Sequence, residues 1–315
     1  MHKIWMLLLP ALLTHSFAVP GGAAECAIVD ENSFAGDGER VRLVRPSGLE
    51  PVANFAAFRA PLAVNTDGAP NSYHPFDPLG REKAINRFDN GIAVGRAGGG
   101  AMTSARRLEV FELWRDNDWV VPSGFTISWK NVLAQTSAGK PCVFQSGPFK
   151  GYFGSLTALQ NELPAAEAGE CGVDNQLDQR VIPAIVLRGA ANPLRGFGAR
   201  KGDLVVAVNP QTRKSAAAVI GDTGDGNRIG EGSVALNMAL LGVTDQPRTF
   251  ADALRLDTGG TAMAIAVLPG TRNFQLVRPV TPASLESRVG QWLRQNGYAD
   301  MAGLSAAVLQ CTAGL

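Results

Sequence analysis

The stretch DLVVAVNPQTRKSAAAVI, at residues 203–220, decides the fold class of this chain. Two apolar runs, 203–208 and 215–220, flank the turn-forming residues NPQT, and this pattern predicts a β-hairpin. A third apolar run, VIPAIVL at 181–187, is typical of a buried strand. The 36 glycines and 19 prolines imply many turns, which favours β structure over helical bundles. The sequence therefore predicts a mainly β (β-rich α+β) protein.

Further elements follow on both sides of this hairpin. A helix is predicted at 233–241, and a long amphipathic helix begins at Pro282, capped by Thr281, and ends at Gly297. A second short helix is expected over about 300–309. Strands are predicted at 40–44, 85–94, 108–114, 119–129 (two strands around a turn), 261–268 and 273–277, the last two as a hairpin. We expect one β-barrel-like domain over 25–280, with a helical extension, 281–315, packed on it.

The N-terminus has the order of a secretory signal peptide. Lys3 precedes an apolar run at 4–13, and small residues follow, so cleavage is expected after Ala18 or Ala24. The run is too short to span a bilayer, which needs about 20 residues. The sequence therefore predicts a leader over 1–24 and a secreted or periplasmic protein.

The four cysteines, Cys26, Cys142, Cys171 and Cys311, all follow the predicted leader. An even number in an oxidising compartment predicts two disulfides, and three pairings are possible. We favour Cys142–Cys171, which closes a local loop, and Cys26–Cys311, which joins the two chain ends.

Charge and histidine content exclude several function classes. Without Lys3 the chain has 28 basic and 28 acidic residues, so the positive field of a nucleic-acid-binding or membrane-binding protein is absent. His74 is the only histidine after the leader, which excludes a zinc site with two or three histidines. The motif G-x-S-x-G of serine hydrolases is also absent. Carboxylates remain the best candidates for chemistry, and no metal or cofactor is expected.

The segment AAVIGDTGDGNRIGEGSVALN, at 217–237, contains the most distinctive pair of carboxylates. Asp222 follows the buried strand, and Glu231, nine positions later, is expected to open the helix at 233–241. Inverting glycosidases hold two carboxyl groups about 6.5–9.5 Å apart, with water between them. Asp222, beside an apolar strand, suits the acid, and Glu231, at a helix start, suits the base, although the roles could be reversed. Alternatively, Asp222 and Asp225 could simply form turns.

This segment resembles the core motif of glycoside hydrolase family 75, the fungal-type chitosanases. The motif's residues are Gly221, Asp222 and Thr223, then Gly230, Glu231, Ser233, Ala235 and Leu236. The resemblance implies that Asp222 and Glu231 are the two catalytic carboxylates. Upstream, LAVNTDG at 62–68 resembles an early strand of the family and places Asp67 near the cleft.

The resemblance implies an endo-acting enzyme that cleaves a β-1,4-linked, chitosan-like amino-sugar polysaccharide by inversion, and we expect it to be secreted and monomeric. Asp67, Asp225 and Tyr73 are expected to bind substrate, Tyr73 by stacking on a sugar ring. The D-T-G strand end is also similar to that of double-psi β-barrel enzymes, which favours a barrel of that kind. A peptidoglycan-directed lytic transglycosylase and a noncatalytic carbohydrate-binding or inhibitor protein are the alternatives.

Overall fold

The structure is a computed structural model that describes residues 26–34, 39–46, 53–163, 171–189, 192–224 and 229–315. The predicted leader at 1–24 and the candidate residue Asp225 lie outside these ranges. Within them, a nine-stranded sheet is the central element and strands slightly outweigh helices, so the β-rich fold class is confirmed.

A nine-stranded mixed sheet forms the centre of the molecule, in the order β1-β2-β3-β11-β8-β9-β7-β10-β4. The strands are β1 (Cys26–Ser33), β2 (Arg40–Pro46), β3 (Phe55–Ala60), β4 (Ala63–Asn65), β7 (Ala184–Arg188), β8 (Leu204–Val208), β9 (Ser215–Gly224), β10 (Glu231–Ser233) and β11 (Met263–Leu268). The predicted hairpin is confirmed, because β8 and β9 pair in antiparallel register.

The sheet curls strongly. Two residues, Pro61 and Leu62, join β3 to β4, although five strands stand between these two in the sheet order. A chain of that length spans only about 10 Å. The end of β3 and the start of β4 must therefore lie close together, which brings β4 and β10 back toward the middle of the sheet.

Apolar side chains fill both faces of the sheet. In β8, Leu204 and Val206 face a cluster that includes Leu285 and Val289 of the C-terminal extension, whereas Val205 belongs to the cluster of the opposite face. Full burial of such side chains stabilises the fold by about 1.5–3 kcal/mol each. The alternation along β8 explains why its sequence is a continuous apolar run.

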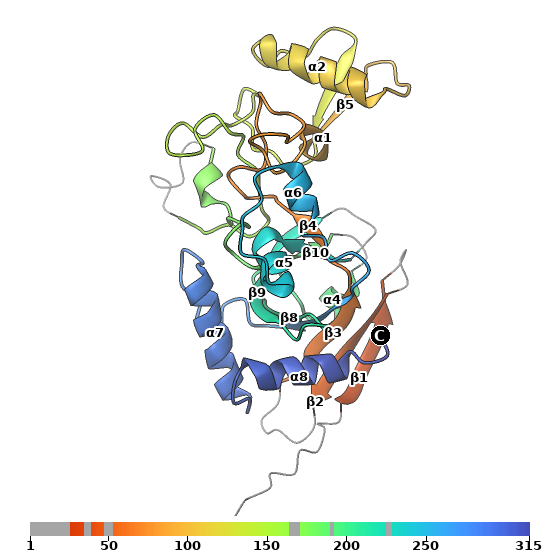
Figure 1. Ribbon diagram of the computed structural model, residues 1–315, viewed down its shortest axis with the longest axis vertical. Helices are drawn as coiled ribbons and strands as arrows, with labels where there is room; N and C mark the ends of the chain where they lie inside the picture. Colours follow the sequence, from red (N-terminus) through yellow and green to blue (C-terminus); the bar gives the residue numbers. More distant parts are fainter. Residues whose placement is uncertain (1–25, 35–38, 47–52, 164–170, 190–191, 225–228) are drawn as a thin grey trace, which may run out of the picture.

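Helices cover the sheet and its edges. They are α4 (Pro193–Gly196), α5 (Val234–Leu241), α6 (Phe250–Leu254), α7 (Pro282–Gln295) and α8 (Met301–Cys311). The predicted start of α7 is confirmed: Thr281 accepts from the backbone N–H of Ser284, and Pro282 is the first helical residue. Figure 1 shows α7 and α8 at the lower end of the molecule, with the C-terminus beside β1.

Residues between β4 and β7 build a lobe at the opposite end from α7 and α8 (Figure 1). Its elements are α1 (Phe88–Gly91), β5 (Ile92–Arg96), α2 (Ser104–Asp116), β6 (Phe125–Trp129) and the 3-10 helix η1 (Val173–Asn175). Phe111, Trp114 and Phe153 lie at the centre of its apolar core. Both predicted disulfides form, Cys26–Cys311 at the chain ends and Cys142–Cys171 in the lobe.

Two predictions in the lobe are wrong. Residues 108–114 belong to helix α2 and not to a strand, because Thr103 caps the helix and the buried residues Val110, Phe111 and Trp114 follow helical spacing. Within 85–94, a short helix precedes β5, which begins only at Ile92.

Two further strands do not form. The backbone has positive φ at Asp118 and Trp119, so only the second half of 119–129 is a strand. The segment 273–277 is a turn with positive φ at Gln275. No hairpin partner was available to it, because β11 already pairs with β3 on one side and β8 on the other. Among the described residues, no helix has the length and apolarity needed to cross a membrane.

Candidate active site

Strand register places the two predicted catalytic carboxylates on either side of one residue, Val186. In the parallel pair β7–β9, Val186 is the partner of Asp222. In the antiparallel pair β7–β10, Gly232 is the partner of Ile185, which puts Glu231 next to Val186. Asp222, Val186 and Glu231 thus form a row across three strands, and all three line one cleft of about 490 Å³.

Two glycines allow Glu231 to occupy this position. A Cβ at Gly230, whose φ is +110°, would stand 2.2 Å from the carbonyl oxygen of Pro61. A Cβ at Gly232 would stand 2.3 Å from Oδ1 of Asn237 in α5. Side chains at these two positions would push β10 away from the β3–β4 connection and from α5. The Gly-Glu-Gly sequence therefore lets a short strand enter a crowded edge of the sheet.

Asp222 is buried and held by the backbone. Its Oδ1 accepts hydrogen bonds from the N–H of Ala158, at 2.9 Å, and of Thr223, at 2.7 Å. Burial raises the pKa of Asp222 to about 6; the two N–H donors oppose this rise, and the negative charge of Glu231 adds to it. A carboxyl group with this pKa can hold a proton in mildly acidic solution and release it during a reaction.

Glu231 does not open the helix as predicted. It lies in β10, while Ser233 caps α5, so the helix dipole does not explain its charge state. Water reaches its side chain, but the cleft walls remove enough solvent to raise the pKa of Glu231, and a 3.4 Å hydrogen bond from Nδ2 of Asn65 opposes the rise.

Asp67 is a third carboxyl group of the cleft, just after β4. Burial raises the pKa of Asp67 to about 8, and the negative charges of Asp222 and Glu231 add to the rise. Its Oδ1 accepts from the hydroxyl of Tyr73 at 3.0 Å, while its backbone N–H donates to Oδ1 of Asn65 at 2.6 Å. Asp67 is therefore fixed in place and carries a proton at neutral pH.

Tyr73 lies behind the cleft and not in it. Its ring is only 2% exposed, and its hydroxyl also accepts from Nδ2 of Asn86 at 2.9 Å. The ring is thus not available to stack on a sugar, contrary to the prediction. Tyr73 instead orients Asp67. The other candidate, Asp225, lies outside the described residues.

The lobe provides the opposite wall of the cleft. Several of its residues were not foreseen from the sequence, because only the fold brings segments around 90, 130 and 158 to the strand ends. The lining residues are Asn65, Asp67, Asn90, Lys130, Asn131, Val132, Leu156, Thr157, Ala158, Gln160, Val186, Asp222, Thr223, Gly224 and Glu231. Over the ranges that the structure describes, no three His, Cys, Asp or Glu side chains are grouped to hold a metal ion.

Comparisons with known proteins do not assign this site. No protein-family model and no curated protein matches the chain. The chemistry of the cleft is therefore argued from its own residues.

Proposed function

We propose that the protein is an exported glycoside hydrolase that cleaves a β-1,4-linked amino-sugar polymer with inversion. The observation that carries the proposal is the row Asp222, Val186, Glu231 at the floor of one cleft. The two disulfides support export, because disulfides persist in oxidising compartments. The curled sheet, with its D-T-G strand end, supports a barrel of the double-psi kind.

The spacing of the carboxylates suits inversion. Two strand spacings, or about 10 Å, separate the backbones of Asp222 and Glu231. Carboxyl groups reaching toward a shared substrate from these backbones can meet the separation of about 6.5–9.5 Å that inverting enzymes use. A retaining enzyme needs a closer pair, about 5–5.5 Å apart.

The raised pKa of Asp222 favours it as the acid. Asp222, with its pKa of about 6, donates its proton to the glycosidic oxygen as the bond to the leaving sugar breaks. Glu231, in its ionised form, takes a proton from a water molecule, and the oxygen of this water attacks the opposite face of the sugar. This is the assignment that the sequence suggested, but its physical cause is chiefly the burial of Asp222 and not a helix dipole at Glu231.

Asp67 supports this pair without adding charge. Because its pKa is about 8, its protonated form donates a hydrogen bond to a sugar hydroxyl near neutral pH. A neutral third carboxyl group also limits the repulsion within the cleft.

The test is product analysis with the purified, disulfide-bonded protein. Chitosan, chitin and peptidoglycan chains are each incubated with it, and reducing ends are measured together with the anomeric form of the first product by NMR. We expect new reducing ends of inverted configuration. Products with anhydro ends would indicate a lytic transglycosylase instead, and binding without any product would indicate a carbohydrate-binding protein.

A further inference from the structure

A second cavity, of about 610 Å³, adjoins the cleft and is strongly basic. We call it the basic pocket. Its cationic lining residues are Arg195, Arg200, Lys201, Arg272 and Arg278. Its one carboxylate, Glu162, is held by Arg278 in a 3.2 Å ion pair, so it does not neutralise the other four cations.

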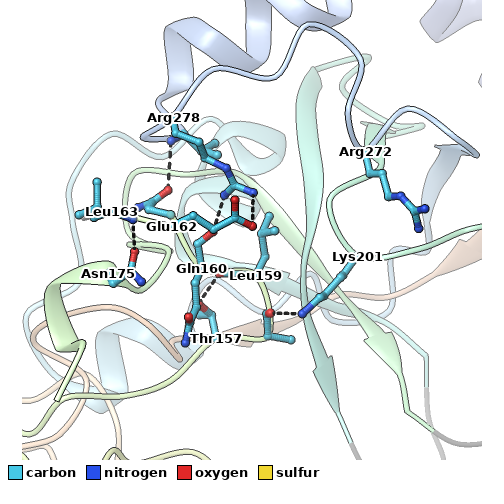
Figure 2. Close-up of polar contacts among 12 residues, drawn as sticks. Thr157, Leu159, Gln160, Glu162, Leu163, Asn175, Lys201, Arg272 and Arg278 are labelled. Atoms are coloured by element: carbon cyan, nitrogen blue, oxygen red, sulfur yellow. Dashed lines mark hydrogen bonds and ion pairs between the residues drawn. The ribbon is translucent and has the colours of Figure 1, made fainter. Parts of the chain in front are cut away.

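Most of these cations are free to bind a ligand. Arg195 and Arg272 are exposed, and within the described residues their side chains make no hydrogen bond. Arg200 donates through NH1 only to backbone carbonyls. Figure 2 shows the guanidinium of Arg272 with no dashed line to any residue drawn, on the same side of the segment 157–163 as Lys201. The nearby carboxylate of Asp203 is buried and accepts from backbone N–H groups.

Arg278 gives the pocket a fixed wall. Its side chain is only 21% exposed, and it donates to the carbonyl of Gln160 as well as to Glu162 (Figure 2). Its Nε is buried and has no hydrogen-bond partner among the residues described. A half-buried guanidinium held in this way keeps the local positive charge in one place.

The basic pocket and the catalytic cleft are neighbours that share a lining residue and are joined by hydrogen bonds. Thr223, the residue after Asp222, lines both. Ala158 connects them directly: its N–H donates to Asp222, and its carbonyl accepts from Nζ of Lys201 at 2.9 Å. A chain of sugars that passes over Asp222 therefore lies next to the basic pocket.

We propose that the basic pocket binds an anionic substituent of the polymer, on a sugar next to the bond that is cleaved. This inference rests on the proposed function for the nature of the ligand. Guanidinium groups bind carboxylates in a planar, two-pronged geometry that an uncharged sugar cannot satisfy. The preferred substrate is then an amino-sugar polymer with acidic groups, either lactyl ethers or uronates, and not the polycation chitosan.

Binding tests the inference separately from catalysis. Three hexasaccharides are titrated by calorimetry into the Glu231→Gln protein: uncharged N-acetylglucosamine, the same chain with a lactyl carboxylate on every second sugar, and an alternating hexosamine–uronate chain. The two charged ligands distinguish the sources of the carboxylate. The titrations are repeated with Arg195→Gln/Arg272→Gln added, and with the matched control pair Arg81→Gln/Arg294→Gln. The control arginines are exposed, lie outside the pocket, and make no side-chain hydrogen bond in the described part of the chain.

We expect at least one charged hexasaccharide to bind roughly tenfold tighter than the uncharged one, since each exposed ion pair contributes a few-fold. The pocket pair of substitutions should remove this preference, and the control pair should keep it. The inference would be overturned if charged and uncharged chains bound equally well, or if no chain bound. It would also be overturned if the pocket pair and the control pair of substitutions reduced the preference for charged chains equally. If charge-selective binding persists but the unsubstituted protein cleaves none of the chains, the inference stands and the proposed hydrolysis is wrong.

Discussion

The acidic cleft and the basic pocket lie side by side, yet two carboxyl groups of the cleft are largely buried, whereas most arginines of the pocket are exposed. Asp67 and Asp222 are removed from water and fixed by hydrogen bonds, and their pKa values rise to about 8 and about 6. Arg195 and Arg272 stay exposed to solvent. Desolvation adjusts a group for proton transfer, whereas exposure preserves a charge for recognition. We therefore expect the acidic cleft to carry out the reaction and the basic pocket to select the substrate.

Removing either of the proposed catalytic carboxyl groups should give the largest effect. Asp222→Asn and Glu231→Gln each delete a proton donor or acceptor, so we expect kcat to fall by about 10²–10⁴. Reducing-sugar release measures this, with circular dichroism to confirm folding. Asp245→Asn is the control, because Asp245 is exposed and outside the cleft. Near-normal rates in both cleft variants would exclude them as acid and base.

The pH dependence of the rate tests which carboxyl group is the acid. Because the pKa of Asp222 is about 6, kcat/KM should fall about tenfold per pH unit above that value. Asp67→Asn should leave this descending limb in place, since Asp67 is already neutral at pH 6. A limb near pH 8 that disappears in Asp67→Asn would instead identify Asp67 as the proton donor.

The stability of the fold should depend on pH through Asp67. Its pKa is about 8 in the folded state against 3.8 in the unfolded chain, so the folded state binds more protons between these values. This contribution is complete below pH 4 and is lost as the pH rises through 8. We expect the free energy of unfolding to decrease by roughly 1–3 kcal/mol over that window, after allowance for partial exposure.

Urea unfolding at pH 5 and pH 8.5 measures this loss. Asp67→Asn has no charge to bury, so its stability should change less than that of the unsubstituted protein across the same window. The remaining slope between pH 4 and 6 is expected from Asp222, whose pKa is raised in the same sense. Identical slopes in the two proteins would mean that Asp67 is not desolvated.

Short sequence segments were sufficient to predict part of the secondary structure. The hairpin at 203–220 has apolar strands and a polar turn within one short segment, and the cap of α7 at Thr281 is equally local. By contrast, Leu108–Trp114 alternates like a strand, but packing of Phe111 and Trp114 into the lobe core favours the helix. Local patterns are decisive only where tertiary contacts agree with them.

The site itself depends on contacts that no short segment contains. Glu231 pairs with Ala63 in β4, so its strand conformation is set by a partner far away in the chain. The same register brings Asn65 to its carboxylate. Spacing in the sequence could identify Asp222 and Glu231 as a pair, but the causes of their pKa values lie in these distant neighbours.

Raising the salt concentration should weaken binding at the basic pocket and leave the chemistry of the acidic cleft nearly unchanged. This is the smallest effect that we expect. The Debye length falls from about 10 Å at 0.1 M salt to about 3 Å at 1 M, so exposed cations such as Arg272 are screened and buried carboxylates are screened much less. KM for an acidic oligosaccharide should therefore rise several-fold across this range, while kcat and the pKa near 6 change little. Steady-state kinetics at both salt concentrations measure this, and an uncharged oligosaccharide is the control because its KM should stay constant. A kcat as salt-sensitive as KM would mean that the two regions are not electrostatically distinct.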